Sequence, residues 1–151
     1  MRTENIRLTL NRSALVVKPR QPFLDWLHAA DATSSDLTLQ ELVLEPAIYL
    51  IPECDTPQEV ADELHELCEQ IFVEQLADWF NDTTTWPPDR SFDVFCLWFD
   101  YQHHSMLIDL CDEPVIRERI ENAKLHAARD QRDLVLANDK LTFHRMCRMA
   151  Q

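Results

Sequence analysis

Residues 56–80 read TPQEVADELHELCEQIFVEQLADWF, and this stretch decides the fold because its pattern predicts a long amphipathic helix. Thr56 is a favourable N-cap residue, Pro57 suits the first helical position, and Glu59 completes a capping box. Apolar residues then recur at helical spacing, and carboxylates occupy most of the positions between them. Asn81 follows the stretch, and we expect it to end the helix in the left-handed conformation that glycine usually supplies.

The chain of 151 residues contains no glycine, where average usage would give about ten. Glycine-rich dinucleotide and phosphate loops, the GxSxG nucleophile elbow and the EF-hand loop are therefore excluded. Tight hairpins built on Asn-Gly or Asp-Gly are excluded for the same reason. We expect the strands to be joined through helices rather than through hairpins.

Shorter patterns on both sides of the long helix predict the rest of the fold. Apolar runs bounded by prolines or polar residues predict strands, and apolar residues at helical spacing predict helices. The predicted strands are 13–18, 47–53 and 105–110, and the predicted helices are 22–30, 38–44, 91–99 and 113–151, the last being either one long helix or two with a break. This order favours an α+β fold, or a small α/β fold, in which helices cover a sheet of three to four strands and a helical C-terminal extension follows.

Charge divides the chain into two parts. Residues 1–113 have a net charge of −16 and residues 114–151 one of +3, which together make the −13 of the whole chain. We therefore predict an acidic α+β domain, 1–112, and a basic helical extension, 113–151. The acidic domain would repel nucleic acid and attract a basic protein partner; the alternative is that its charge serves solubility alone. The basic extension can dock on the acidic domain of its own chain or on that of a second copy, and the second arrangement would make a homo-oligomer.

Cysteine usage and hydropathy predict where the protein works. The five cysteines are odd in number and widely spaced, and no CxxC occurs. This pattern argues against a disulfide framework and against a zinc ribbon, and it favours a reducing compartment. The N-terminus lacks the apolar segment of a signal peptide, and no window approaches the ~20 apolar residues of a membrane span. We expect a cytoplasmic protein with no membrane partner.

Residues 86–112, WPPDRSFDVFCLWFDYQHHSMLIDLCD, hold the densest set of side chains with catalytic potential. The candidate catalytic residues are Asp100, His103, His104 and Asp109. A histidine oriented by a carboxylate is a common general base, and both groups bind Zn, Fe or Mn. Asp109 within a strand would need a partner such as Arg90 or one of the histidines. The spacing matches no metal motif, so no metal or cofactor is expected. The alternative is that the histidines lie in a turn and Asp109 bonds locally.

The same stretch, together with NRSALVVKPRQPFLDWL at 11–27 and AIYLIPE at 47–53, resembles a family of small uncharacterised bacterial proteins. The resemblance spans residues 11–112 and leaves the basic extension outside. It implies no activity, cofactor or catalytic residue.

Two groups of charged side chains are candidates for binding. Three of the six basic residues in 1–113 are candidates for a clamp that holds an anion or a substrate carboxylate at a strand end, namely Lys18, Arg20 and Arg90. Three glutamates of the long helix are candidates for a surface that imitates a row of phosphates or binds a basic partner, namely Glu63, Glu66 and Glu69. The alternatives are internal ion pairs for the cations and a solvated helix face for the glutamates.

Three functional hypotheses follow, and the sequence does not decide whether the protein is an enzyme. The leading one is a small acidic cytoplasmic protein that acts as a non-enzymatic protein-interaction module. One alternative is a hydrolase that uses the histidine and aspartate residues, with or without a metal. The other is an acidic inhibitor that imitates nucleic acid and binds a basic enzyme.

Overall fold

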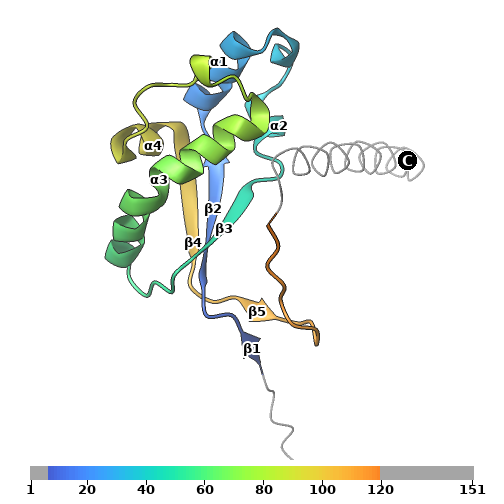
Figure 1. The fold of residues 1–151 in the computed structure, drawn as a ribbon, viewed down its shortest axis with the longest axis vertical. Coiled ribbons are helices and arrows are strands. Elements are labelled where there is room, and N and C mark those ends of the chain that lie inside the picture. Colours follow the sequence, from blue (N-terminus) through green and yellow to red (C-terminus); the bar gives the residue numbers. More distant parts are fainter. Residues whose placement is uncertain (1–6, 120–151) are drawn as a thin grey trace, which may run out of the picture. The chain divides into compact units, whose positions relative to one another are not determined.

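Among residues 7–119 the longest element is helix α3, Pro57–Trp79, and it starts as the sequence predicts (Figure 1). This computed structural model describes residues 7–119 of the chain. The Glu59 N–H donates to Thr56 Oγ1 at 3.2 Å, and the Thr56 N–H donates to the Glu59 carboxylate at 3.2 Å. These reciprocal bonds satisfy two N–H groups that the first helical turn leaves without an intrahelical partner, so the predicted capping box is confirmed.

A three-stranded antiparallel sheet carries the helices, with strand order β3-β2-β4. Its strands are β2, Ser13–Pro19, β3, Ala47–Ile51, and β4, Phe99–His104, and the other helices are α1, Gln21–Ala30, η1, Ala32–Ser34, α2, Leu39–Leu42, η2, Thr83–Thr85, and α4, Phe92–Trp98. The chain passes from β2 to β3 through α1, η1 and α2, and from β3 to β4 through α3, η2 and α4. The predicted α+β class is therefore confirmed, and helices join the three strands as expected.

The predicted strand 105–110 is wrong. The third strand of the sheet is β4, which lies directly before it and pairs with β2 over its whole length. Of the predicted run, only β5, Ile108–Asp109, is a strand, and it pairs with β1, Leu8–Thr9, in a separate two-stranded sheet. The sequence FDYQHH does not look like a strand because its inward-facing positions are not consistently apolar. Of Phe99, Tyr101 and His103, only Phe99 has a side chain without a polar group.

The core lies between the sheet and the helices on one of its faces, where aromatic rings from four elements meet. Phe23 of α1, Phe72 of α3, Phe95 of α4 and Phe99 of β4 are all fully buried. The ring centroid of Phe99 lies 5.0 Å from those of Phe72 and Phe95, and 5.5 Å from that of Phe23. Because one residue of β4 touches three helices, this strand fixes how the helical layer sits on the sheet.

The turns of this glycine-free chain use aspartate instead of the left-handed conformation. No described residue has a positive φ. At four loop positions an aspartate Oδ1 accepts the backbone N–H of the second residue along, at 2.9 to 3.0 Å: Asp31–Thr33, Asp82–Thr84, Asp89–Ser91 and Asp109–Cys111. The expectation for Asn81 is therefore wrong. The last residue of helix α3 is Trp79, and its C-cap residue Phe80 is already extended, with φ of −152° and ψ of 112°.

The chain divides into two units, residues 1–111 and 112–151. Residues 113–119 are exposed and form no helix, so the predicted C-terminal helix does not begin at 113. A short segment without a core to pack against gains too little to offset the cost of starting a helix. The rest of that predicted helix lies outside the described residues, and the predicted domain boundary stays a prediction. Within residues 7–119, no helix has the length and apolar content needed to cross a membrane.

Candidate functional site

The two candidate histidines lie on opposite faces of the sheet. His103 and His104 are consecutive in β4, and side chains alternate along a strand. His103 is half-buried on the inner face, where its Nε2 is buried without a hydrogen-bond partner in the described part of the chain, whereas His104 is exposed. Asp100 shares the outer face with His104 but lies four residues away, about 13 Å along a strand. These three side chains do not form one site.

Asp109 lies in β5, in the other sheet. Its Oδ1 accepts the Cys111 N–H at 2.9 Å, so this carboxylate closes a local turn. Neither Arg90 nor any histidine within residues 7–119 bonds to it. Within residues 7–119, no three histidine, cysteine or acidic side chains are placed to hold a metal ion.

Arg90 joins the loop before α4 to the long helix. Its Nη1 donates to the Pro87 carbonyl at 2.8 Å, and its Nη2 lies 3.4 Å from Oε1 of Glu69. The arginine is three-quarters buried in its side chain, so this pair holds the loop against α3. Arg90 is therefore separated from the other two cations of the predicted clamp.

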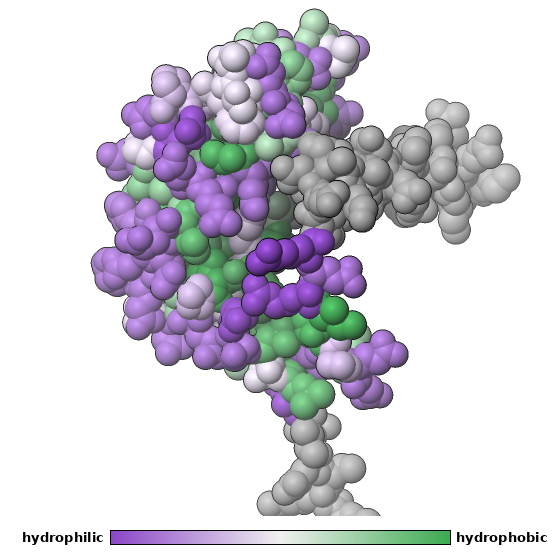
Figure 2. Space-filling model, viewed as in Figure 1, coloured by the Kyte–Doolittle hydropathy of each residue, from purple (hydrophilic) through white to green (hydrophobic). Residues whose placement is uncertain are grey.

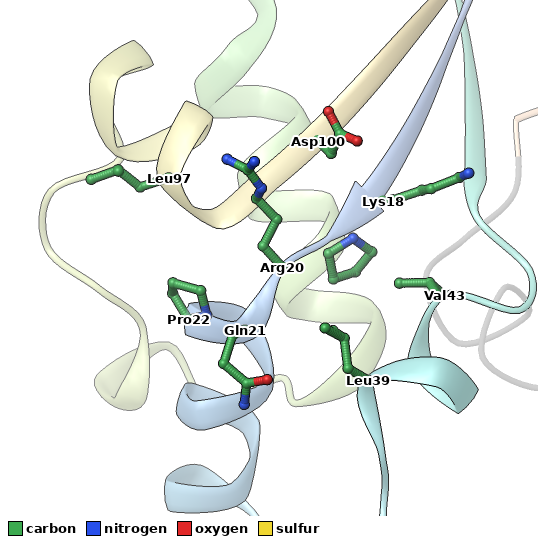
Figure 3. A pocket seen from close by; sticks show the side chains of 9 residues that line it. Lys18, Arg20, Gln21, Pro22, Leu39, Val43, Leu97 and Asp100 are labelled. Atoms are coloured by element: carbon green, nitrogen blue, oxygen red, sulfur yellow. The ribbon is translucent and has the colours of Figure 1, made fainter.

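Lys18 and Arg20 both line an open cleft of about 480 Å³ where β2 ends and α1 begins (Figure 3). We call it the strand-end cleft. The Arg20 N–H donates to the Trp98 carbonyl at 2.7 Å, and Arg20 Nη1 donates to the Cys96 carbonyl at 2.9 Å. Both bonds fix Arg20 against the last turn of α4. The cleft therefore places an anchored guanidinium beside a strand end, as the sequence predicts for two of the three cations.

Lys18 has no ion pair within the described residues, although it is opposite Asp100 in the register of β2 and β4. Figure 3 shows its side chain extending away from Arg20 and from Asp100. The cleft also has an apolar wall, which consists of Pro22 of α1, Leu39 of α2 and Val43, the residue after α2. The amino-acid sequence does not single out these wall residues, because their positions carry no signal beyond ordinary helical periodicity.

The exposed side of α3 is the second candidate site. The acidic face consists of the exposed Asp62, Glu66, Glu69 and Glu74 and the half-buried Glu63. Burial raises the pKa of Glu74, and the neighbouring charge of Asp78 raises it further. Figure 2 shows hydrophilic residues over this part of the molecule. The three glutamates that the sequence singles out thus share one helix surface. Of these three, Glu69 is the one that pairs with Arg90.

No match was found when the chain was compared with protein-family models, curated proteins and solved structures.

Cysteine reactivity tests whether the thiols belong to a site. Cys54 and Cys68 are buried and Cys96 is half-buried, and burial raises the pKa of all three thiols. Because the thiolate is the nucleophile, we expect iodoacetamide near pH 8 to alkylate the exposed Cys111 at least about tenfold faster than these three. Peptide mass mapping after brief labelling measures the order. Fast labelling of Cys54 would instead indicate an activated thiol.

Proposed function

We propose that the protein is an interaction module whose acidic face binds a basic protein partner. The observation that carries this proposal is the charge of α3, which holds seven carboxylates and no lysine or arginine. Charges that lie on one rigid helix keep fixed spacings, so a basic partner can engage several of them without ordering a loop.

The electrostatics near α3 support this proposal. Burial, followed by the nearby carboxylates of Glu63 and Glu59, raises the pKa of Cys54, which is the direction that a negative local potential produces. Such a potential speeds the approach of a basic partner and weakens beyond about 10 Å in 0.1 M salt. Binding should therefore be fast and salt-sensitive.

A lysine-rich peptide labelled with a fluorophore provides the test. The double variant Asp62→Asn with Glu66→Gln removes two charges from the acidic face, and Asp36→Asn with Glu53→Gln removes two exposed charges elsewhere. Fluorescence anisotropy should show the first variant weakening binding about threefold to tenfold and the second by less than about twofold.

Circular dichroism on both variants controls for folding, since all four carboxylates are exposed. Equal weakening by the two variants would mean that net charge alone attracts the peptide, and this result contradicts a defined acidic face. Binding that is unchanged between low and high salt would also contradict it.

The other hypotheses have less support. An inhibitor that imitates nucleic acid would use the same acidic face, and competition by duplex DNA for its basic target distinguishes it. For the hydrolase, the candidate residues His103, His104 and Asp109 lie on opposite faces or in different sheets. Self-association through the basic extension concerns residues that lie mostly outside those described.

A further inference from the structure

We propose that the strand-end cleft binds an acidic peptide segment in which a carboxylate lies next to an aliphatic or aromatic side chain. This site is separate from the acidic face of α3. It prefers an acidic ligand, whereas the acidic face prefers a basic one. The proposal therefore goes beyond the interaction with a basic partner.

The charge of the cleft favours an acidic ligand, because the cleft is positively charged although it lies on an acidic unit. Residues 7–111 contain five basic side chains, and two of them, Lys18 and Arg20, line the cleft. Helix α1 also begins there, with Arg20 as its N-cap residue, whose side chain makes no cap hydrogen bond. The positive end of the helix dipole therefore adds to the two cations. Asp100 is the one acidic residue in the lining.

Preorganisation is the second argument. The Arg20 guanidinium is held by its Nη1 bond to the Cys96 carbonyl, and its other N–H groups remain to donate to a carboxylate. An arginine whose position is already fixed loses little side-chain entropy when it binds. Lys18, without an ion pair in the described residues, adds a second and more adaptable positive charge.

The apolar wall is the third argument and selects the ligand class. Leu97 of α4 is 64% exposed at the cleft. Leu39 of α2 and Val43, which directly follows that helix, are half-buried on another side of the cleft. An inorganic anion would leave these side chains in contact with water, whereas an apolar side chain next to the carboxylate would cover them. The ligand must therefore combine an anion with an apolar group.

The openness of the cleft favours a peptide over a small molecule. Lys18, Arg20, Gln21, Leu97 and Asp100 are all exposed, and among the lining residues only Pro19 is buried. Small-molecule sites usually enclose most of their ligand. An extended peptide can instead lay two neighbouring side chains across an open surface and keep its remaining backbone in water.

NMR titration of the full-length ¹⁵N-labelled protein tests the proposal with defined probes. The peptide Ac-Leu-Glu-Leu-Phe-NH₂ should shift the amide resonances of Lys18, Gln21 and Leu97, with a Kd below about 1 mM. Ac-Leu-Gln-Leu-Phe-NH₂ lacks the charge and Ac-Ser-Glu-Ser-Ser-NH₂ lacks the apolar groups. Each should bind at least about tenfold more weakly. Sodium acetate tests for adventitious anion binding.

Protein variants then assign the contacts. Arg20→Gln should weaken binding of the first peptide about tenfold. Lys18→Gln removes an unpaired charge with little risk to the fold and should weaken it about threefold. Arg12→Gln is the matched control because Arg12 lies outside the cleft and, within the described residues, bonds to the neighbouring Asn11 carbonyl.

Four results would overturn the proposal: no shifts at the cleft, equal affinity for the uncharged peptide, acetate binding as tight as the first peptide, or equal loss in Arg12→Gln. The outcome is independent of the acidic face. The double variant Asp62→Asn with Glu66→Gln should leave binding of the acidic peptide unchanged or slightly stronger, because repulsion falls.

Discussion

Replacing Phe72 with alanine should destabilise the protein by about 3 to 5 kcal/mol, the largest effect that we expect from one side chain. Phe72 is fully buried at the centre of the core. Its ring centroid lies 5.2 Å from that of Trp98 and 5.0 Å from that of Phe99. The truncation removes apolar contact with both rings and leaves a cavity that the rigid sheet and α3 cannot close. Since domains of this size are stable by about 5 to 15 kcal/mol, the variant should be partly unfolded or close to it.

Urea denaturation followed by tryptophan fluorescence and far-ultraviolet circular dichroism measures this loss. Phe92→Ala is the matched control because Phe92 is half-buried and its ring contact is with His65, at a centroid distance of 3.9 Å. The control should cost less than half as much, because water already reaches part of its ring. Similar losses for both variants would mean that the aromatic cluster is not the centre of the core.

Val16→Pro should destabilise the protein by about 3 kcal/mol or more, through the backbone rather than the side chain. Val16 is in the central strand, where it is opposite Ile48 of β3 and Gln102 of β4. Proline cannot donate a ladder hydrogen bond, and its φ near −65° differs from that of an antiparallel strand. No other residue in the strand can restore the lost bond.

The control is Val16→Thr, which keeps the β-branched shape and the backbone N–H. Val16 is half-buried on the outer face of the sheet, so the hydroxyl can reach water and the cost should stay within about 1 kcal/mol. Equal stability of the two variants would contradict the central position of β2. This pair of variants therefore tests the strand order directly.

Local sequence rules predicted most of the elements. Helix α3, its capping box and strand β2 follow from residues that are close together in the chain, so short-range rules describe them well. The prediction failed where pairing overrides composition. Residues 105–110 have a stronger apolar pattern than β4, yet β4 is the strand that pairs with β2, while only Ile108 and Asp109 of that run form a strand, in the other sheet.

Candidate sites were predictable only where one element carries them. Glu63, Glu66 and Glu69 share a surface because helical geometry sets their positions. Lys18 and Arg20 reach one cleft because they flank the same strand end. Arg90 was grouped with them by charge alone, and the loop that carries it instead brings it to Glu69.

The sequence by itself determined the class of fold, the long helix and the absence of glycine-built turns and loops. These properties depend on composition and on spacings within single elements, where backbone geometry leaves few choices. Only the tertiary structure decided that β4 completes the sheet, that the two histidines face opposite sides, and that Leu97 joins Lys18 and Arg20 at one cleft. Those arrangements depend on which buried surfaces fit together, and packing acts between residues that are far apart in the chain.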